Sequence, residues 1–467
     1  MDKSTLKAEA GRRGDAEEDR GSGFGSKTTR IGTHLANSDQ VFSQRLSVSA
    51  LKQWRRAPTT RKRRRARREG KKIVAAKQQF QGINQEEEGL GVIAEVETPV
   101  HSRFDIELAA STDDEEIRAL LRRIVIPGAI QVTFEREPCF FDSCALHGGL
   151  CQVVIGRDRS SGSIIGMGTR SVDQCFVNGR PAAVGYLSDL RLEPAYRGGT
   201  LIARGYKLFR ELHRDGAASL YTTAIFSSNR PALSTIAQGR AGLPQYHDLG
   251  AIHCPGINLQ GRKMEIRAGC EILRGTRALL PAIVDCLNRN HSRHQFAPFH
   301  REQDFLDGRW LDCRPENFHV ALHHGEVVGA LAAWDQSGFK QTRIAGYDRT
   351  LRWSIPLVNG IRRLARATPY PSPGEYVRAL HLSFIAVDLD DPTVFRALLR
   401  RAYNDALGKG YLYAMVSLHE DDPLLPVLGD YSLTRFDGRL FCVCYPDGEE
   451  LFSRLDHRVP YVEAAIL

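Results

Sequence analysis

Residues 184 to 209 read VGYLSDLRLEPAYRGGTLIARGYKLF, and this stretch decides the fold. An apolar strand stops at Pro194, Arg197 and two glycines follow, and an amphipathic helix begins at once. A helix start in this position presents backbone N–H groups to a phosphate or pyrophosphate. Gly198 and Gly199 let the backbone approach such a ligand, and Arg197 adds a fixed positive charge. The alternative is a tight strand-to-helix connection in which the glycines serve only the turn.

The sequence on both sides of this stretch alternates short apolar strands with amphipathic helices. Upstream, we expect a helix over Asp113 to Ile124 and a hairpin over Cys151 to Thr169. A second hairpin turns at Asn178-Gly179, a pair that tolerates the positive φ of a two-residue turn. Downstream, Leu220 to Phe226 has the composition of a buried strand. This order indicates a mixed α/β (α+β) domain that begins near Val96.

The second half of the chain repeats the same order more loosely. Its expected elements are a helix over Leu273 to Asn290, a hairpin of His319 to Leu322 with Val327 to Trp334, a strand over Leu380 to Val387, a helix over Val394 to Ala406 and a strand over Tyr411 to Ser417. We therefore expect two related domains in tandem, residues 96–262 and 263–467, preceded by a disordered basic tail at residues 1–95.

The segment Leu190 to Thr200, Leu-Arg-Leu-Glu-Pro-Ala-Tyr-Arg-Gly-Gly-Thr, resembles the pattern L-x-V-x-P-x-Y-R-G-x-G of the GNAT superfamily of acyl-coenzyme A-dependent N-acyltransferases. Asn229, with Ala232 three residues on, resembles the next landmark of that superfamily. The resemblance implies tandem GNAT-like domains, an acyltransferase activity, and acetyl-coenzyme A or another acyl-coenzyme A as co-substrate. It also implies a cofactor-binding set: Leu190, Arg191, Leu192, Arg197, Gly198, Gly199, Thr200, Leu201, Ile202 and Asn229.

The resemblance also assigns roles within this set and shows where the sequence departs from the pattern. Leu190 to Leu192 is expected to run beside the pantetheine arm and to offer an N–H to the thioester carbonyl, while Arg197 to Ile202 hold the pyrophosphate. Thr200 and Ile202 stand where the superfamily has glycine or another small residue. Ile236 stands where many members carry the tyrosine that protonates the leaving thiolate, so the general acid is unassigned.

Acyl transfer to an amine requires groups that accept and donate protons near the strand. Asp189 and Glu193 are the nearest carboxylates, and Tyr221 is a candidate to relay or donate a proton. We therefore predict Asp189, Glu193 and Tyr221 as catalytic residues. The alternative for Asp189 is a structural carboxylate paired with Arg191 or Arg170.

The connection in the second half that corresponds to the glycine loop is VDLDDPTVF, Val387 to Phe395. It contains three aspartates and no glycine, and its charge opposes a pyrophosphate. We predict a degenerate second domain that closes the acceptor cleft of the first. Arg378, His381 and His419 either contact the acceptor or are ordinary surface and core residues.

Positive charge is concentrated in one segment, although the whole chain carries a net charge of +9. Arg55 to Lys72 holds 11 Lys or Arg against one Glu, which leaves residues 73–467 close to neutral. Any contact with nucleic acid is therefore expected at this tail. The chain has no apolar run long enough to cross a bilayer and no secretory h-region at its start, so we expect a cytoplasmic protein without a membrane partner.

The ten cysteines are scattered without a CxxC pair, which is typical of reduced, mostly buried thiols. Four residues that can ligate a metal are close in sequence but match no zinc-site spacing: Cys139, Cys144, His147 and Cys151. We expect no metal there. Cys442 and Cys444 alternate onto one face of a strand and are expected in the core.

These patterns predict an N-acyltransferase in which an amine attacks acyl-coenzyme A directly, with acetyl as the favoured acyl group. The acceptor is expected to be a small-molecule or peptide amine. The alternative is a non-catalytic acyl-coenzyme A-binding or regulatory protein, which Thr200, Ile202 and the missing tyrosine favour. A third interpretation gives the basic tail the main role, as a tether to nucleic acid or a ribosome.

Overall fold

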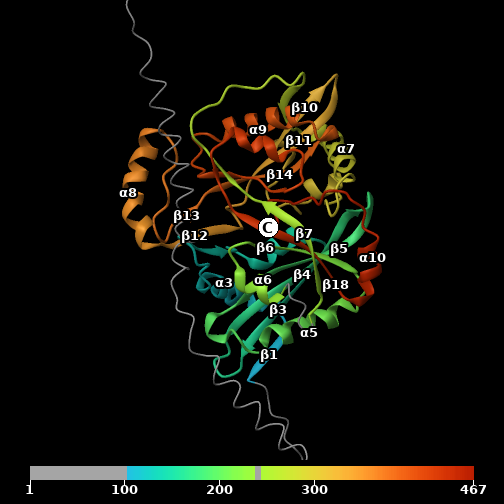
Figure 1. Cartoon of the computed structure of the whole chain (residues 1–467), viewed down its shortest axis with the longest axis vertical. Helices are drawn as coiled ribbons and strands as arrows, with labels where there is room; N and C mark the ends of the chain where they lie inside the picture. Colours follow the sequence, from blue (N-terminus) through green and yellow to red (C-terminus); the bar gives the residue numbers. More distant parts are fainter. Residues whose placement is uncertain (1–102, 237–242) are drawn as a thin grey trace, which may run out of the picture. The chain divides into compact units, whose positions relative to one another are not determined.

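The computed structural model describes residues 103–236 and 243–467. These residues form a mixed α/β fold with sheets of eight, seven and three strands (Figure 1). The predicted alternation of strands and helices is thereby confirmed. The predicted disordered tail at residues 1–95 lies outside the described residues.

The eight-stranded sheet contains most strands of the first half, in the order β1-β3-β4-β5-β6-β18-β7-β16. Its members are β1 (Phe104–Leu108), β3 (Leu150–Asp158), β4 (Ile164–Val177), β5 (Arg180–Leu192), β6 (Leu220–Phe226), β18 (Asp437–Cys444), β7 (Gln245–His253) and β16 (Leu418–His419). The predicted hairpin turn is confirmed, because Val177 pairs with Arg180 and both Asn178 and Gly179 have positive φ.

Helices cover both faces of this sheet. Strand β3 alternates its side chains, so that Val153 and Ile155 pack in the core with α3 (Asp114–Arg123), whereas Val154 packs against α5 (Leu201–His213). Successive side chains of a strand point to opposite faces, which places the two helices on opposite sides. The shorter helices of this half are α4 (Phe140–Cys144) and α6 (Arg230–Ile236).

The seven-stranded sheet repeats this arrangement in the order β17-β8-β15-β14-β11-β10-β9. Its members are β17 (Leu433–Thr434), β8 (Gly256–Asn258), β15 (Tyr413–Met415), β14 (Ala379–Val387), β11 (Glu326–Asp335), β10 (Phe318–His323) and β9 (Glu271–Arg274). Helices α7 (Leu280–His291) and α9 (Pro392–Ala406) pack in separate cores against it.

The helix predicted over Leu273 to Asn290 starts later than expected. Glu271–Arg274 is strand β9, which pairs with β10, and the helix begins at Leu280. Thr276 separates the two elements because its side chain accepts a hydrogen bond from the Leu279 N–H. The apolar residues before Thr276 therefore belong to a strand, which the helical spacing of the following residues obscured.

Each large sheet contains strands from the other half of the chain: β16 and β18 lie in the eight-stranded sheet, and β8 lies in the seven-stranded sheet. β18 is a late segment of the sequence, yet it lies between β6 and β7 and pairs antiparallel with both (Figure 1). β8 occupies the corresponding place between β15 and β17 of the second sheet. The halves therefore share backbone hydrogen-bond ladders, and neither sheet is complete without the other half.

A three-stranded sheet also joins the halves. β2 (Ile130–Glu135) pairs antiparallel with β12 (Gln341–Tyr347), which pairs with β13 (Tyr376–Val377). Helix α8 (Arg349–Leu364) connects β12 to β13 and stands beside this small sheet, at the left of the view in Figure 1. A last short helix, α10 (Glu449–Ser453), follows β18.

The close contact between β5 and β6 generates a prediction about stability. A Cβ added at Gly185 would lie 1.9 Å from the Tyr221 ring, whose hydroxyl is hydrogen bonded to Arg170 and His213. We expect Gly185→Ala to lower the free energy of unfolding by about 1–3 kcal/mol in urea denaturation. Gly205→Ala, in α5 with open space around it, is the control and should raise stability by about 0.5–1 kcal/mol. Equal midpoints for Gly185→Ala and the parent protein would contradict the packing described.

Candidate functional site

The parallel strands β5 and β6 separate after a short paired region. They share only the pairs Gly185 with Tyr221 and Tyr186 with Thr222. Beyond them, β5 continues to pair with β4 up to Leu192, and β6 continues to pair with β18 up to Phe226. The remaining link is a hydrogen bond of 2.7 Å from the Thr223 hydroxyl to the Leu187 carbonyl. Beyond Tyr186, the edge of β5 that faces β6 therefore forms no β-ladder with β6.

A β-bulge lies in the separated part of β5. The register between β4 and β5 shifts at this point, and Asp189 adopts a φ of 50°. Aspartate tolerates this left-handed conformation better than most residues. Bulges redirect side chains and interrupt pairing, and they are common beside functional sites.

The bulge places the Asp189 carboxylate between two arginines. Its Oδ1 lies 3.9 Å from Arg136 and 3.9 Å from Arg191. Burial alone would raise the pKa of Asp189, but the two guanidinium groups outweigh that effect and hold the pKa below its ordinary value. Asp189 is therefore ionised near neutral pH. Of the partners considered from sequence, Arg191 is paired with Asp189, whereas Arg170 pairs with Asp215.

Titratable groups from two other segments, His147 and Lys340, interact electrostatically with this carboxylate. His147 stacks on Tyr186 with ring centroids 5.6 Å apart, and burial lowers the pKa of His147 to about 4. Burial and the charge of Arg136 lower the pKa of Lys340 to about 7. The Lys340 ammonium donates to the carbonyl of Ala465 at 3.1 Å. Lys340 was not predicted from the sequence, because no local motif marks it.

The glycine loop leads from β5 to α5 as predicted. Arg197 to Thr200 are exposed, and Gly198 has a φ of 87°, a conformation that glycine adopts readily. Thr200 occupies the N-cap of α5, but its side chain forms no capping hydrogen bond. The first N–H groups of the helix are thus left without a cap from Thr200, beside the positive charge of Arg197. Arg197 itself donates to the Leu192 carbonyl at 3.2 Å.

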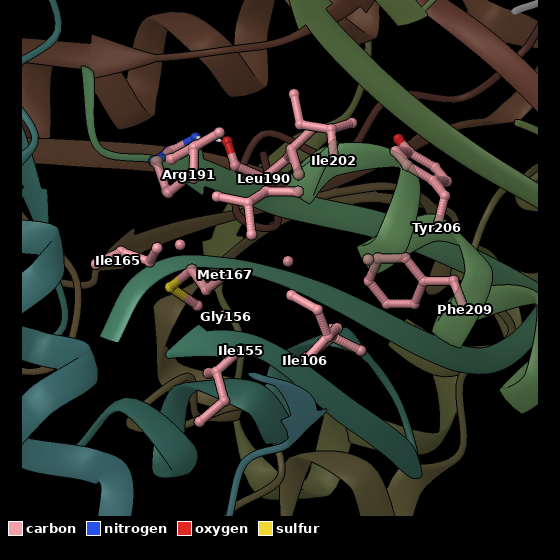
Figure 2. A pocket seen from close by; sticks show the side chains of 16 residues that line it. Ile106, Ile155, Gly156, Ile165, Met167, Leu190, Arg191, Ile202, Tyr206 and Phe209 are labelled. Carbon is pink, nitrogen blue, oxygen red and sulfur yellow. Dashed lines mark hydrogen bonds between the residues drawn. The ribbon is translucent and has the colours of Figure 1, made fainter. Parts of the chain in front are cut away.

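An apolar cavity of about 40 Å³ lies between α5 and the sheet (Figure 2). Ile202, Tyr206 and Phe209 line it from α5, and Ile106 lines it from β1. Five residues of the predicted cofactor-binding set also line the cavity: Leu190, Arg191, Leu192, Leu201 and Ile202. A single water needs about 10–15 Å³ of such space, so the cavity has room for a short apolar group.

The other predicted site residues lie in different surroundings. Glu193 forms an ion pair with Arg123 at 2.9 Å, at the end of β5. Tyr221 is buried, and its hydroxyl is hydrogen bonded to Arg170 at 3.1 Å and to His213 at 2.8 Å. Asn229 is exposed, and its side chain accepts a hydrogen bond from the Ala232 N–H at the start of α6.

The second half repeats the separated strands and the bulge, but its site is filled. β14 and β15 run parallel over three pairs, and Phe384 has a φ of 54° at a register shift with β11. The Phe384 N–H donates to Glu463 at 2.8 Å, and the Ile385 N–H donates to the Tyr461 hydroxyl at 3.0 Å. In contrast, within the described residues no side chain accepts a hydrogen bond from the N–H groups of Leu187 to Leu192.

The paired sheets, the two bulges and the strand-loop-helix connection define a GNAT fold that occurs twice in the chain. No protein-family model and no curated protein sequence matches the chain.

One solved structure shares the fold at a TM-score of 0.50, and two further structures match with lower scores. N-myristoyltransferase from Saccharomyces cerevisiae with bound myristoyl-CoA superposes with a TM-score of 0.50 and 11% sequence identity, over 78% of this chain and 85% of that chain. A GCN5-related glucosamine N-acetyltransferase region of a fungal β-N-acetylglucosaminidase matches with a TM-score of 0.49 and 14% sequence identity, over 73% of this chain and 38% of that chain. A GCN5-related N-acetyltransferase from Sphaerobacter thermophilus matches with a TM-score of 0.45 and 12% sequence identity, over 74% of this chain and 96% of that chain.

The ion pairs of Asp189 generate a prediction with a defined pH dependence. Asp189→Asn leaves Arg136 buried without a charged partner and should cost about 3 kcal/mol of unfolding free energy at pH 7. Because the pKa of Asp189 is lower in the folded state, this stabilisation is full above the unfolded-state pKa and is lost as pH falls through the folded-state pKa. In urea denaturation, the unfolding free energies of Asp189→Asn and the parent protein should therefore differ less at pH 3 than at pH 7.

Glu193→Gln provides the control for this experiment. Its ion pair with Arg123 is near the surface, so the variant should lose about 1 kcal/mol or less at either pH. A difference for Asp189→Asn that does not change with pH would contradict the proposed ionisation of Asp189.

Proposed function

We propose that the protein transfers an acyl group from acyl-coenzyme A to an amine at the separated edge of β5. The contrast between the halves carries this proposal. Both halves have a bulge and diverging parallel strands. Among residues 103–236 and 243–467, only the second half has side chains hydrogen bonded to the backbone N–H groups after its bulge. The corresponding edge of β5 is left for an extended ligand, and such an edge binds backbone-like amides well.

Coenzyme A fits the chemistry of this edge and of the loop that follows it. The pantetheine arm contains two amides that can pair with the backbone of Leu187 to Leu192. The start of α5 and Arg197 suit a pyrophosphate, because the helix dipole and the guanidinium both favour anions. In the second half, Asp388 and Asp390 occupy the corresponding connection, and their charge disfavours a pyrophosphate there.

The small apolar cavity supports a short acyl group as the part transferred. Its volume suits an acetyl group, whereas a long chain requires α5 to move away from the sheet. Gly168 on β4 brings the sheet close to α5, because a Cβ at this position would lie 3.2 Å from the Phe209 ring. The S. cerevisiae neighbour, by comparison, was solved with bound myristoyl-CoA.

The groups around the bulge suit an amine acceptor. The ionised Asp189 can bind the ammonium form of the acceptor, and Lys340, with a pKa of about 7, can accept its proton near neutral pH. The amine nitrogen then attacks the thioester carbon, the carbon–sulfur bond breaks, and the coenzyme A thiolate takes up a proton. Backbone N–H groups of β5 next to the bulge can stabilise the oxyanion.

Tyr221 favours a second candidate function, that of a non-catalytic acyl-coenzyme A-binding protein. Its hydroxyl is hydrogen bonded to Arg170 and His213 in the core, and the residue as a whole is 1% exposed. The predicted proton donor is therefore engaged elsewhere, and Ile236 takes the place of the superfamily's tyrosine. A protein without a general acid can still bind the cofactor.

Calorimetric titration of acetyl-coenzyme A into the full chain tests the cofactor site. We expect binding that weakens about 10- to 100-fold in the Arg197→Glu, Gly199→Asp double variant, because the new anions oppose the pyrophosphate. The matched control is Arg210→Glu with Gly149→Asp, which has the same charge change at exposed positions away from the loop. Equal affinities of the two double variants, or no binding of acetyl- or longer acyl-coenzyme A by the parent chain, would contradict the proposal.

Release of free coenzyme A with a panel of amines then separates the enzyme from the binding protein. An enzyme should show an acceptor-dependent rate that rises as the pH passes about 7. Binding without turnover for every amine class would favour the second candidate.

A further inference from the structure

Three potential metal ligands converge at the end of the exchanged strand, away from the proposed acyl-transfer site. His247 lies on β7, Cys444 ends β18, and Glu449 lies in the first turn of α10. The Cys444 Sγ is 3.5 Å from His247 Nε2 and 3.3 Å from Glu449 Oε1, and those two atoms are 3.3 Å apart. Cys444 pairs with Leu220 at the start of β6, whereas the strands separate toward Phe226.

These distances match the edges of a tetrahedron around zinc. Bonds of about 2.3 Å to sulfur and about 2.0–2.1 Å to nitrogen and oxygen place ligand atoms about 3.3–3.6 Å apart. The same histidine nitrogen, Nε2, faces both the thiol and the carboxylate. In a catalytic relay the carboxylate would contact the other ring nitrogen, so the atoms here converge on one point instead of forming a chain.

The surroundings suit a bound ion. Cys444 is fully buried, but the side chains of His247 and Glu449 are 23% and 34% exposed, which leaves a route for the metal and for a water ligand. The His247 ring stacks on Phe452 with centroids 3.8 Å apart, and this contact fixes its orientation. Cys442 pairs directly with His247 across the sheet, so a second thiol lies on the same face.

We propose that His247, Cys444 and Glu449 form a zinc site that fastens β18 to β7 and α10, with a water molecule as the fourth ligand. A mixed set of thiolate, imidazole and carboxylate ligands is typical of zinc. On binding, the metal displaces the thiol proton, which passes to solvent. This site lies outside the segment Cys139 to Cys151.

Metal analysis of the purified full chain tests the zinc site. We expect about one zinc per chain, lost in Cys444→Ser and reduced at least tenfold in affinity in Glu449→Gln, whereas Cys270→Ser, at a partly exposed cysteine elsewhere, retains it. In the cobalt-substituted parent protein, a sulfur-to-cobalt charge-transfer band is expected. Glu449→Gln alters a partly exposed side chain and keeps the test valid if Cys444→Ser does not fold. Absence of zinc and of the cobalt band in the parent chain, or equal zinc affinity in Glu449→Gln, would overturn the proposal.

A separate observation concerns helix α8. It exposes large apolar side chains, with Trp353, Leu357 and Leu364 at 80%, 71% and 88% exposure, spaced four and seven residues apart on one stripe. The opposite side is attached to the protein through Leu351 and Arg362, which are buried. Such an apolar stripe on a cationic helix is typical of a helix that lies in a membrane interface.

The charges around the stripe select the partner. Arg349, Arg352, Arg363 and Arg366 are exposed, and residues 349–374 contain no Asp or Glu. Two copies of this surface would repel each other, whereas an anionic bilayer attracts it. We infer that α8 lies on an anionic phospholipid surface, contrary to the expectation of no membrane partner. In the described residues no helix is long and apolar enough to span a membrane.

Tryptophan quenching by brominated lipids in vesicles tests this surface. Because Trp54 lies beside the basic tail in sequence, it is first replaced by Phe. With phosphatidylcholine–phosphatidylglycerol vesicles, we expect quenching in the Trp54→Phe chain that falls at least twofold when Trp353→Phe is added, since Trp310 and Trp334 are buried. Trp353→Ser with Leu357→Ser should weaken vesicle binding at least tenfold. If the vesicles bound only the basic tail, Trp353 would remain unquenched, and this result would overturn the inference. The absence of vesicle binding, or self-association of the protein through α8, would overturn it as well.

Discussion

The separation of two parallel strands after two paired residues is the constraint on which the rest of the structure depends. β5 is held by β4 as far as Leu192, and β6 is held by β18 as far as Phe226, so neither strand can turn back to the other. Backbone groups along such an edge need partners. In the second half, Tyr461 and Glu463 supply them, and burial raises the pKa of Glu463 at the same time. In the proposed function, a ligand takes this role in the first half.

The strand exchange explains why the two copies act as one structure. β18 completes the sheet that contains the candidate site, although it is separated from β6 by about half of the chain. The segment that fills the second site, with Tyr461 and Glu463, follows β18 and α10 in sequence. One stretch of chain therefore supports the first site and fills the second. The proposed zinc site would strengthen the same attachment, at the end of β18 opposite the separated strands.

Local features were predictable from the sequence, and long-range partners were not. The turn at Asn178-Gly179, strand β6 and the helix after Gly199 were found because their signals lie within a few residues. The exchange of β18 was missed because hydrophobic alternation marks a strand but does not specify its neighbours. The environment of Asp189 was only partly foreseen, since Arg136 and Lys340 come from distant segments and meet it only in the folded protein. The GNAT fold was predictable because its glycine loop is contiguous.

Amide hydrogen exchange with and without acetyl-coenzyme A is the most direct measurement of the central claim that only the first site is open. We expect acetyl-coenzyme A to slow amide exchange at Leu187 to Leu192 and in the first turn of α5, and to leave exchange at Leu382 to Val387 unchanged. Slower exchange at Leu382 to Val387, or no change along β5 despite binding, would contradict this claim.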